Sequence, residues 1–366
     1  MDLRNQVVVI GCGIVGAAIA YELSLVDGLK ITVLDRQQPA QGSTGAALGV
    51  LMGAISKKTK GRAWQLRQTS MQRYETLIPE LETLTNCQIR FNRHGILMLC
   101  FAEEDLASWE PVVETRASQG WRLEIWKRAQ LQLSCPQLRN ENIVGAIYSP
   151  QDRQVDPVAL TQALVAAAQK NGVTFKFGVT VEEIKSTSDL LNRCCNSINT
   201  TAGELDVDWL VVASGLGSTP LTAQLEQPVA IKPVLGQALQ LQLKQPIGNP
   251  EFQPVITGDD VHIVPLGEGQ YWVGATVEFP NEVGEVVAEA GLLEKVLQEA
   301  IAFCPPLADA TILRTWSGKR PRPDGRPAPV IEKLPGYSNI LLAIGHYRNG
   351  ILLAPATAQA IREMIV

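Results

Sequence analysis

The stretch that decides the fold is VVVIGCGIVG, at residues 7–16. Its first four residues are apolar and predict a short buried strand, and the sequence that follows predicts a helix over residues 14–25. A Gly-x-Gly-x-x-Gly motif joins the two. In such a motif Gly11 makes the tight turn, Gly13 admits a pyrophosphate to the backbone, and Gly16 lets helix and strand pack closely. We interpret the stretch as a dinucleotide-binding turn, in which the helix N-terminus faces the phosphates.

The next predicted strand supports this interpretation. Residues 31–34 are apolar, and they end at Asp35, which lies 19 residues after Gly16. A carboxylate at this place accepts hydrogen bonds from a ribose. Strand, helix and strand form a compact βαβ unit, and the turn by itself leaves NAD and FAD open.

A run of small residues, GSTGAALG, follows at residues 42–49. A flat ring system or a pyrophosphate can lie against such a backbone. The alternative is an ordinary helix start that is capped by Ser43.

The middle of the chain continues the alternation of helices and strands. Asp156 and Pro157 are typical of the start of a helix, which we expect over residues 157–170. Strands are predicted at residues 174–177 and 209–213. Two more helices are predicted at residues 103–118 and 291–303.

Glycine and proline shape the predictions for the rest of the chain. Short strands over residues 229–277 predict an antiparallel sheet. Pro79 is expected to divide a helix over residues 62–84, and residues 318–329 are expected to form a loop. Pro355 is expected to mark the start of the regular part of the last helix.

The order of these elements predicts two interleaved domains in an α/β protein. A Rossmann-like nucleotide-binding domain is expected to alternate along the chain with an α+β substrate domain that is built on an antiparallel sheet. The first domain is assigned residues 1–85, 150–225 and 321–366, and the second is assigned residues 86–149 and 226–320.

Composition excludes several classes of protein. The 366 residues include 46% hydrophobic and 19% charged residues, which is typical of a globular protein and excludes wholesale disorder. A formal net charge of -5 argues against a nucleic-acid partner. Seven scattered cysteines favour free thiols in the cytoplasm, although the adjacent Cys194 and Cys195 leave a redox pair open. No transmembrane helix and no metal site are expected.

The C-terminal stretch GHYRNGILLAPAT, at residues 345–357, is more specific, because it places an arginine between two glycines at a strand-to-helix turn. It resembles a signature of the D-amino-acid oxidase family of flavoproteins, and within it the glycine oxidase branch of thiamine biosynthesis. Further matching stretches, in chain order, are the N-terminal glycine motif, Ser43-Thr44, VVASG at 211–215, IVP at 263–265, VGAT at 273–276 and WSGKRP at 316–321.

The resemblance implies noncovalent FAD and a set of residues that hold it. These are Gly11, Cys12, Gly13, Ile14, Val15, Gly16, Asp35, Arg36, Ser43, Thr44, Ala47, Val181, Ser214, Gly215, Gly345, Arg348, Asn349, Gly350, Ile351 and Leu352. On the substrate side it implies Arg320 as the carboxylate anchor, supported by Arg348. It also places His262 on the substrate side, and the alternative for His262 is a histidine of the core.

Three departures from the family pattern concern the substrate side and the attachment of the flavin. His262 stands where the family has a tyrosine that helps to bind the carboxylate, and Leu266 replaces a basic residue. The loop between Pro321 and Asp324 looks one residue shorter than usual. The cysteine that attaches flavin in related sarcosine oxidases is absent from residues 318–323.

The activity that the resemblance implies is oxidation of a C–N bond in a small amine or amino acid. Glycine, sarcosine or a small D-amino acid is the favoured substrate. Hydride transfer to flavin N5 gives an imine and then a keto acid, and oxygen accepts the electrons to yield hydrogen peroxide. Two alternatives remain: a dehydrogenase that passes electrons to a quinone or another acceptor, and a non-catalytic flavoprotein subunit. A homo-oligomer is possible.

Overall fold

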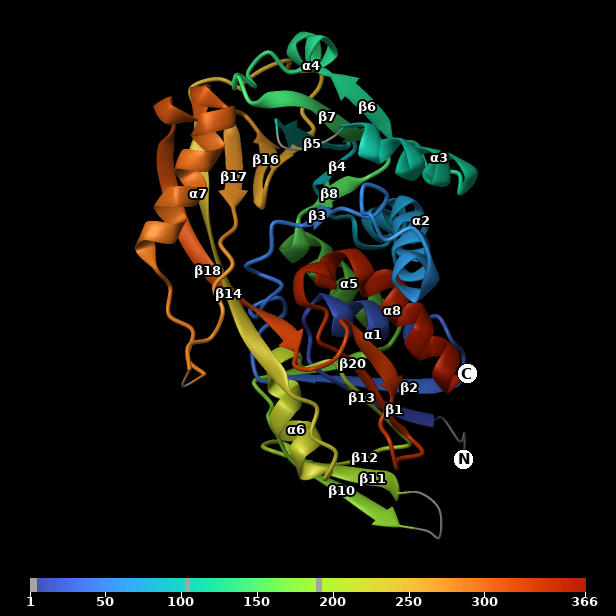
Figure 1. The fold of residues 1–366 in the computed structure, drawn as a ribbon. Helices are drawn as coiled ribbons and strands as arrows, with labels where there is room; N and C mark the ends of the chain where they lie inside the picture. Colours follow the sequence, from blue (N-terminus) through green and yellow to red (C-terminus); the bar gives the residue numbers. More distant parts are fainter. Residues whose placement is uncertain (1–4, 103–105, 189–192, 283) are drawn as a thin grey trace.

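The computed structural model describes residues 5–102, 106–188, 193–282 and 284–366. Two large sheets form the framework of the fold. The lower sheet in Figure 1 has six strands in the order β19-β20-β13-β1-β2-β9. Its strands are parallel except β19, which runs antiparallel to β20. Their bounds are β1 (Asn5–Ile10), β2 (Leu29–Asp35), β9 (Thr174–Phe177), β13 (Trp209–Val212), β19 (Val330–Lys333) and β20 (Ile340–Ile344).

Both faces of this sheet are covered, which explains why its central strands β13 and β20 are apolar throughout and β1 is apolar from Val7 onward. In β1, Val7 and Val9 pack into the core beneath the helices, whereas Val8 and Ile10 pack into the core on the other face. The helices are α1 (Ile14–Ser24), α2 (Gly61–Thr85), α5 (Pro157–Lys170) and α8 (Gly350–Ile365). The other face carries α6 (Ser218–Gln224) and a small sheet of β10 (Val181–Ser188), β11 (Arg193–Thr200) and β12 (Gly203–Asp206).

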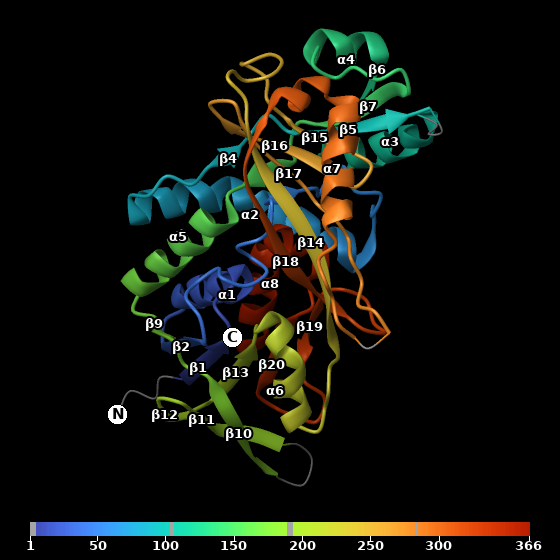
Figure 2. The same cartoon turned by 90° about the vertical axis from the view of Figure 1, so that its left-hand side faces the viewer.

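The second sheet has eight strands in the order β18-β14-β17-β16-β15-β5-β7-β6. Its strands pair antiparallel, except that β15 and β5 are parallel. In Figure 2 its longest strands, β14 and β18, run down toward the six-stranded sheet, and α7 packs against β16 and β17. The bounds are β5 (Ile96–Phe101), β6 (Glu124–Lys127), β7 (Ile143–Ser149), β14 (Ile231–Gln242), β15 (Val255–Gly258), β16 (Val261–Gly267), β17 (Gln270–Gly274), β18 (Thr311–Pro323) and α7 (Ala290–Phe303).

Smaller elements connect the two sheets. A three-stranded sheet pairs β8 with β3 and β4, and helices α3 and α4 lie near the edge of the large sheet (Figure 1). The helix predicted from residue 103 begins outside the described residues, and a 3-10 turn at Leu106–Trp109 precedes α3. The remaining bounds are β3 (Val50–Leu51), β4 (Phe91–Asn92), β8 (Arg153–Val155), α3 (Glu110–Ser118) and α4 (Arg128–Ser134).

The α/β fold class and the antiparallel sheet over residues 229–277 are confirmed, and so is the cap of α5. There the Asp156 carboxylate accepts hydrogen bonds from the N–H groups of Val158 and Ala159 at 3.0 and 3.1 Å. The interleaved boundaries stay a prediction, and β18 runs without a break through the one at residue 321. Among the described residues, no helix is long and apolar enough to cross a membrane.

Two predictions about helix-breaking prolines are wrong. Helix α2 continues through Pro79, because its apolar residues around that position are buried in the main core. Helix α8 begins at Gly350, not near Pro355. Proline has no N–H for the Ile351 carbonyl, and the hydroxyl of Tyr74 in α2 donates to that carbonyl instead. The neighbouring N–H of Ala356 donates to Ser70 Oγ at 3.1 Å, so α2 supplies the partners that α8 lacks.

The predicted loop over residues 318–329 is wrong for its first half, which belongs to β18. This strand lies at the edge of the sheet and pairs with β14, where Pro321 stands opposite Pro233. Prolines are tolerated at a sheet edge, because the N–H that they lack is not needed by a further strand. The strand places Arg320 on a rigid element rather than on a loop.

The cysteines are free thiols, including the adjacent pair Cys194 and Cys195 in β11. Cys195 is buried, and burial raises the pKa of its thiol to about 12. A protonated thiol is a poor nucleophile, so the structure gives no support to a redox pair there.

Candidate functional site

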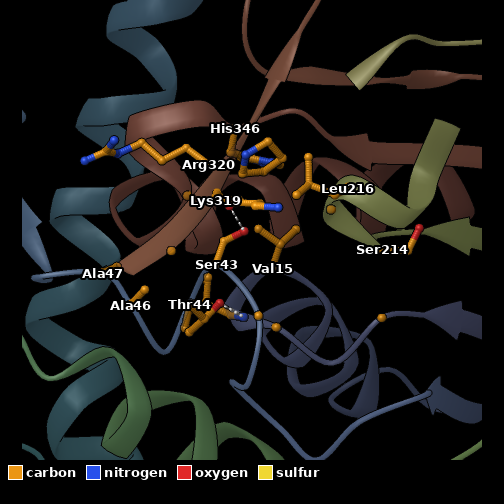
Figure 3. Close-up of a pocket in the computed structure, with 18 of the residues that line it drawn as sticks. Val15, Ser43, Thr44, Ala46, Ala47, Ser214, Leu216, Lys319, Arg320 and His346 are labelled. Atoms are coloured by element: carbon orange, nitrogen blue, oxygen red, sulfur yellow. Dashed lines mark hydrogen bonds between the residues drawn. The ribbon is translucent and has the colours of Figure 1, made fainter. Parts of the chain in front are cut away.

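One cavity brings together most of the residues that the sequence singled out. Its volume is about 650 Å³, which lies within the usual range of cofactor and ligand sites. It extends from Asp35 at the end of β2 to Arg320 in β18, so both sheets contribute to its wall. Figure 3 shows the part that is lined by the Ser43 segment, the start of α1 and β18.

The three glycines of the N-terminal motif are required for different reasons. Gly11 has φ of +108°, and a Cβ there would lie 2.5 Å from the carbonyl oxygen of Ala213 in the neighbouring chain segment. A Cβ at Gly16 would lie 1.9 Å from the carbonyl oxygen of Gly11, so this glycine lets α1 approach the turn. Gly13 lines the cavity and is the N-cap of α1. The geometry therefore matches the roles expected from the motif.

Two polar groups fix the turn from outside. The Asp35 carboxylate accepts the N–H of Cys12 at 2.6 Å, and its other oxygen accepts the N–H of Gln37 at 2.9 Å. Thr44 Oγ1 accepts the N–H of Ile14 at 3.0 Å, and the dashed line in Figure 3 marks this bond. The N–H group of Val15, which also lines the cavity, has no carbonyl partner within the helix, so it can serve an anion there.

The segment at 42–49 does not start a regular helix, and Ser43 is not a helix cap. Its hydroxyl donates to the backbone carbonyl of Lys319 in β18 at 2.6 Å, a bond that Figure 3 also shows. Trp316 of the same strand donates from its indole N–H to the carbonyl of Ala46 at 3.1 Å. These two bonds join the nucleotide-binding half of the cavity wall to the edge strand of the large sheet.

The C-terminal motif also contributes to the wall. Gly345 and Tyr347 have φ of +66° and +54°, and this left-handed backbone turns the chain from β20 into α8. For a bulky residue such as tyrosine that conformation is unusual and is often found at functional sites. His346 is buried, and its Nε2 lies 2.9 Å from Thr357 Oγ1. Burial lowers the pKa of His346 to about 4, so its ring is neutral near neutral pH.

Arg320 lies at the other side of the view in Figure 3 from Ser214. Its Nη1 donates to the carbonyl oxygens of Leu235 and Thr276, each at 3.0 Å. Burial lowers the pKa of Arg320, and the neighbouring Arg348 adds to this effect. A Cβ at Gly236 would lie 2.3 Å from Nη2 of Arg320, so the glycine makes room for the guanidinium.

Arg348 forms an ion pair with Asp260, a residue that no sequence motif indicates. Its Nη1 lies 2.9 Å from Asp260 Oδ1, and its Nη2 lies 3.4 Å from Asp260 Oδ2. Burial alone would lower the pKa of Arg348, but the hydrogen bond to Asp260 raises it. His262 stands two residues after Asp260, and its Nδ1 lies 2.8 Å from Thr257 Oγ1. Burial lowers the pKa of His262 to about 4, and the nearby arginines act in the same direction.

The predicted site residues fall into two groups. Those that line the cavity are Gly11, Gly13, Ile14, Val15, Asp35, Arg36, Ser43, Thr44, Ala47, Val181, Ser214, Gly215, His262, Arg320, Gly345, Arg348, Gly350 and Ile351. Those that do not line it are Cys12, Gly16, Asn349 and Leu352. In this second group, Cys12 and Gly16 act through the backbone contacts described above.

Among the cavity residues that the sequence did not predict, Asp260, Gly236 and Lys319 bear most on the function of the site. Asp260 and Gly236 carry no motif signal, because their importance depends on arginines far away in the sequence. Lys319 points toward Val15 and Leu216 in Figure 3, whereas the Arg320 side chain points away from them. A strand alternates the directions of successive side chains, so recognising β18 as a strand would have separated these two cations.

Known proteins are similar to this chain in both sequence and fold. Residues 6–364 match the model of the DAO family, described as FAD dependent oxidoreductase. The chain is 31% identical over 370 residues to glycine oxidase of Bacillus subtilis, covering 100% of this chain and 94% of that protein. It is 33% identical over 373 residues to the bifunctional protein ThiO/ThiG of Synechocystis, of which it covers 52%. The chain thus spans about half of the bifunctional relatives that it matches.

The fold comparison agrees. The crystal structure of glycine oxidase from Geobacillus kaustophilus has a TM-score of 0.86 to this structure at 26% identity. The match covers 99% of this chain and 95% of that one, so it includes both sheets.

Proposed function

The chain belongs to the family of FAD-dependent oxidoreductases, and on that premise we propose that it oxidises the C–N bond of a small amine or amino acid. Glycine, sarcosine or a small D-amino acid is the favoured substrate. The observation that carries the proposal is that Arg320 and Arg348 face the same cavity as the dinucleotide-binding turn. A cavity with a nucleotide end and a cationic end suits a reaction between a bound cofactor and a small carboxylate.

The residues present fit FAD. Gly13 and the start of α1 leave backbone room and N–H donors for a pyrophosphate, and Asp35 offers carboxylate oxygens to a ribose. Lys319 points toward the same turn, where it can oppose phosphate charge (Figure 3). When bound, FAD supplies the acceptor for a hydride from the substrate carbon that carries the amine. Nothing in this wall requires a covalent attachment, so we propose that FAD is held noncovalently.

The protein groups bind and orient the substrate. We propose that Arg320 anchors its carboxylate, since an arginine offers two parallel donors to a carboxylate. The two carbonyl oxygens that Arg320 already contacts hold the guanidinium in place without neutralising it. His262 is neutral near neutral pH, so it adds no positive charge at this end of the cavity. The oxidised product is an imine, which water hydrolyses to a keto acid, and oxygen is the proposed electron acceptor.

Purified protein assayed against glycine, sarcosine and small D-amino acids tests the reaction. We expect hydrogen peroxide in proportion to the substrate consumed. If turnover requires an artificial acceptor and no peroxide forms, the protein is a dehydrogenase rather than an oxidase. If none of the amines is consumed under either condition, the proposed substrate class is wrong.

The role of Arg320 is tested separately with Arg320→Met. We expect a loss of roughly 3 kcal/mol in transition-state stabilisation for sarcosine, expressed mainly as a higher KM, with FAD content unchanged. N-methylethylamine, in which a methyl group replaces the carboxylate, is the control substrate and should be affected much less. An equal loss for both amines would contradict the carboxylate clamp.

A further inference from the structure

The Asp260–Arg348 ion pair places an anion at the cationic end of the cavity. Asp260 lies between β15 and β16, and Arg348 lies at the turn before α8. Two hydrogen bonds join the side chains, and both residues line the cavity together with Arg320 and His262. The hydrogen bond from Arg348 lowers the pKa of Asp260, so the carboxylate is ionised near neutral pH.

Because of this ion pair, the two arginines have different roles at the cationic end of the cavity. The charge of Arg348 is neutralised by Asp260, whereas Arg320 contacts only backbone carbonyls in its two hydrogen bonds. His262 is neutral, and Lys319 points toward the start of α1 rather than toward Arg320 (Figure 3). Among the residues that the structure describes, Arg320 is therefore the guanidinium that remains at this end of the cavity to receive a substrate carboxylate, since Arg36 lies next to Asp35 at the other end. A second carboxylate would meet the Asp260 carboxylate.

We propose that Asp260 is a specificity-determining residue, which restricts the cavity to amines with a single carboxylate by occupying Arg348. It acts through Arg348 and not on the reacting atoms. The inference rests on the proposed function, because it assumes that the substrate carries a carboxylate. Removing the charge of Asp260 frees Arg348 and admits amines with two carboxylates.

Sarcosine and iminodiacetate are a matched pair for the test, since they differ by one carboxylate on the same secondary amine. For Asp260→Asn we expect the ratio of kcat/KM for iminodiacetate to that for sarcosine to rise roughly tenfold, mainly through KM, as expected when a unit charge is removed in a partly screened site. Asp260→Glu keeps the negative charge, so its ratio of kcat/KM values should stay close to that of the wild type. An unchanged ratio in Asp260→Asn would overturn the proposal.

The double variant Asp260→Asn/Arg348→Met shows whether the effect passes through Arg348. The gain for iminodiacetate should disappear in it, and a gain that persists would overturn the proposed pairing.

A binding measurement separates this proposal from the proposed reaction. Acetate and malonate are titrated into the FAD-loaded protein while the flavin absorbance is followed. Asp260→Asn should lower the Kd of malonate relative to that of acetate by a similar factor, even if no amine is turned over. That result with an inactive wild type would refute the reaction and support the role of Asp260, whereas an unchanged Kd ratio would refute the role of Asp260.

Discussion

Gly236→Ala tests how the carboxylate anchor is held, with a change of one methyl group. The new Cβ would lie 2.3, 2.4 and 2.5 Å from Nη2, Nη1 and Cζ of Arg320, all closer than real Cβ contacts. The guanidinium must therefore move away from β14. It then loses its hydrogen bonds to the carbonyls of Leu235 and Thr276, both 3.0 Å long in the native structure.

The size of the expected effect follows from the hydrogen bonds that Arg320 loses and from the water that replaces them. Hydrogen bonds to a charged group contribute roughly 1.5–3 kcal/mol each, and a displaced guanidinium regains part of that from water. We expect a net loss of about 2 kcal/mol in kcat/KM for sarcosine, or about thirtyfold. The free energy of unfolding should fall by no more than about 2 kcal/mol, because water replaces part of the lost hydrogen bonds and alanine suits a strand better than glycine.

The assay combines steady-state kinetics with thermal unfolding of the FAD-loaded protein. Gly291→Ala in α7 is the control, since its new Cβ would meet no atom within 4 Å beyond its chain neighbours and the backbone of its own helix. In an Arg320→Met background Gly236→Ala should cause little further loss, because the displaced group is already absent. Unchanged kinetics for Gly236→Ala, or a full additional loss in the double variant, would refute the reasoning.

Three further predictions concern other parts of the site and its support. Tyr74→Phe leaves the buried Ile351 carbonyl without its donor and should lower the free energy of unfolding by roughly 1–3 kcal/mol in urea titrations. Asp35→Ala should weaken FAD binding by roughly tenfold or more in equilibrium dialysis, and unchanged affinity would exclude a ribose contact. His346 has its folded pKa lowered to about 4 from 6.5, so the unfolded chain binds the extra proton and stability should fall as pH falls from 6.5 to 4. His346→Asn should reduce that pH dependence by up to roughly 3 kcal/mol, measured by urea titration at each pH.

The sequence predicts a feature of the fold or the site correctly where the contacts that determine this feature are local. The close approach of Gly16 to Gly11 and the cap at Asp156 involve neighbours within a few residues, so their motifs predict them. Asp35 could be placed because the strand that ends there follows the glycine motif at a spacing that a βαβ unit imposes.

Long-range contacts explain the features that the sequence did not predict. Helix α8 continues through Pro355 because Tyr74, far away in the chain, supplies a donor that no local rule can anticipate. Asp260 could not be predicted either, because its partner Arg348 is 88 residues away. Gly236 is needed only because the guanidinium of Arg320, from a strand that is distant in the sequence, lies against it. The residues that tune the substrate end are thus those with the weakest sequence signal.

The position of β20 has a consequence for biosynthesis. Although it is the last strand of its sheet to be made, β20 lies between β13 and β19 inside the sheet that begins with β1. A nascent chain that has not reached Ile340 leaves the edge of β13 open, and open strand edges invite pairing with other chains. Premature termination before Ile340 should therefore yield aggregates rather than a smaller flavoprotein, because the sheet that holds the N-terminal nucleotide turn is completed only after β20 has left the ribosome.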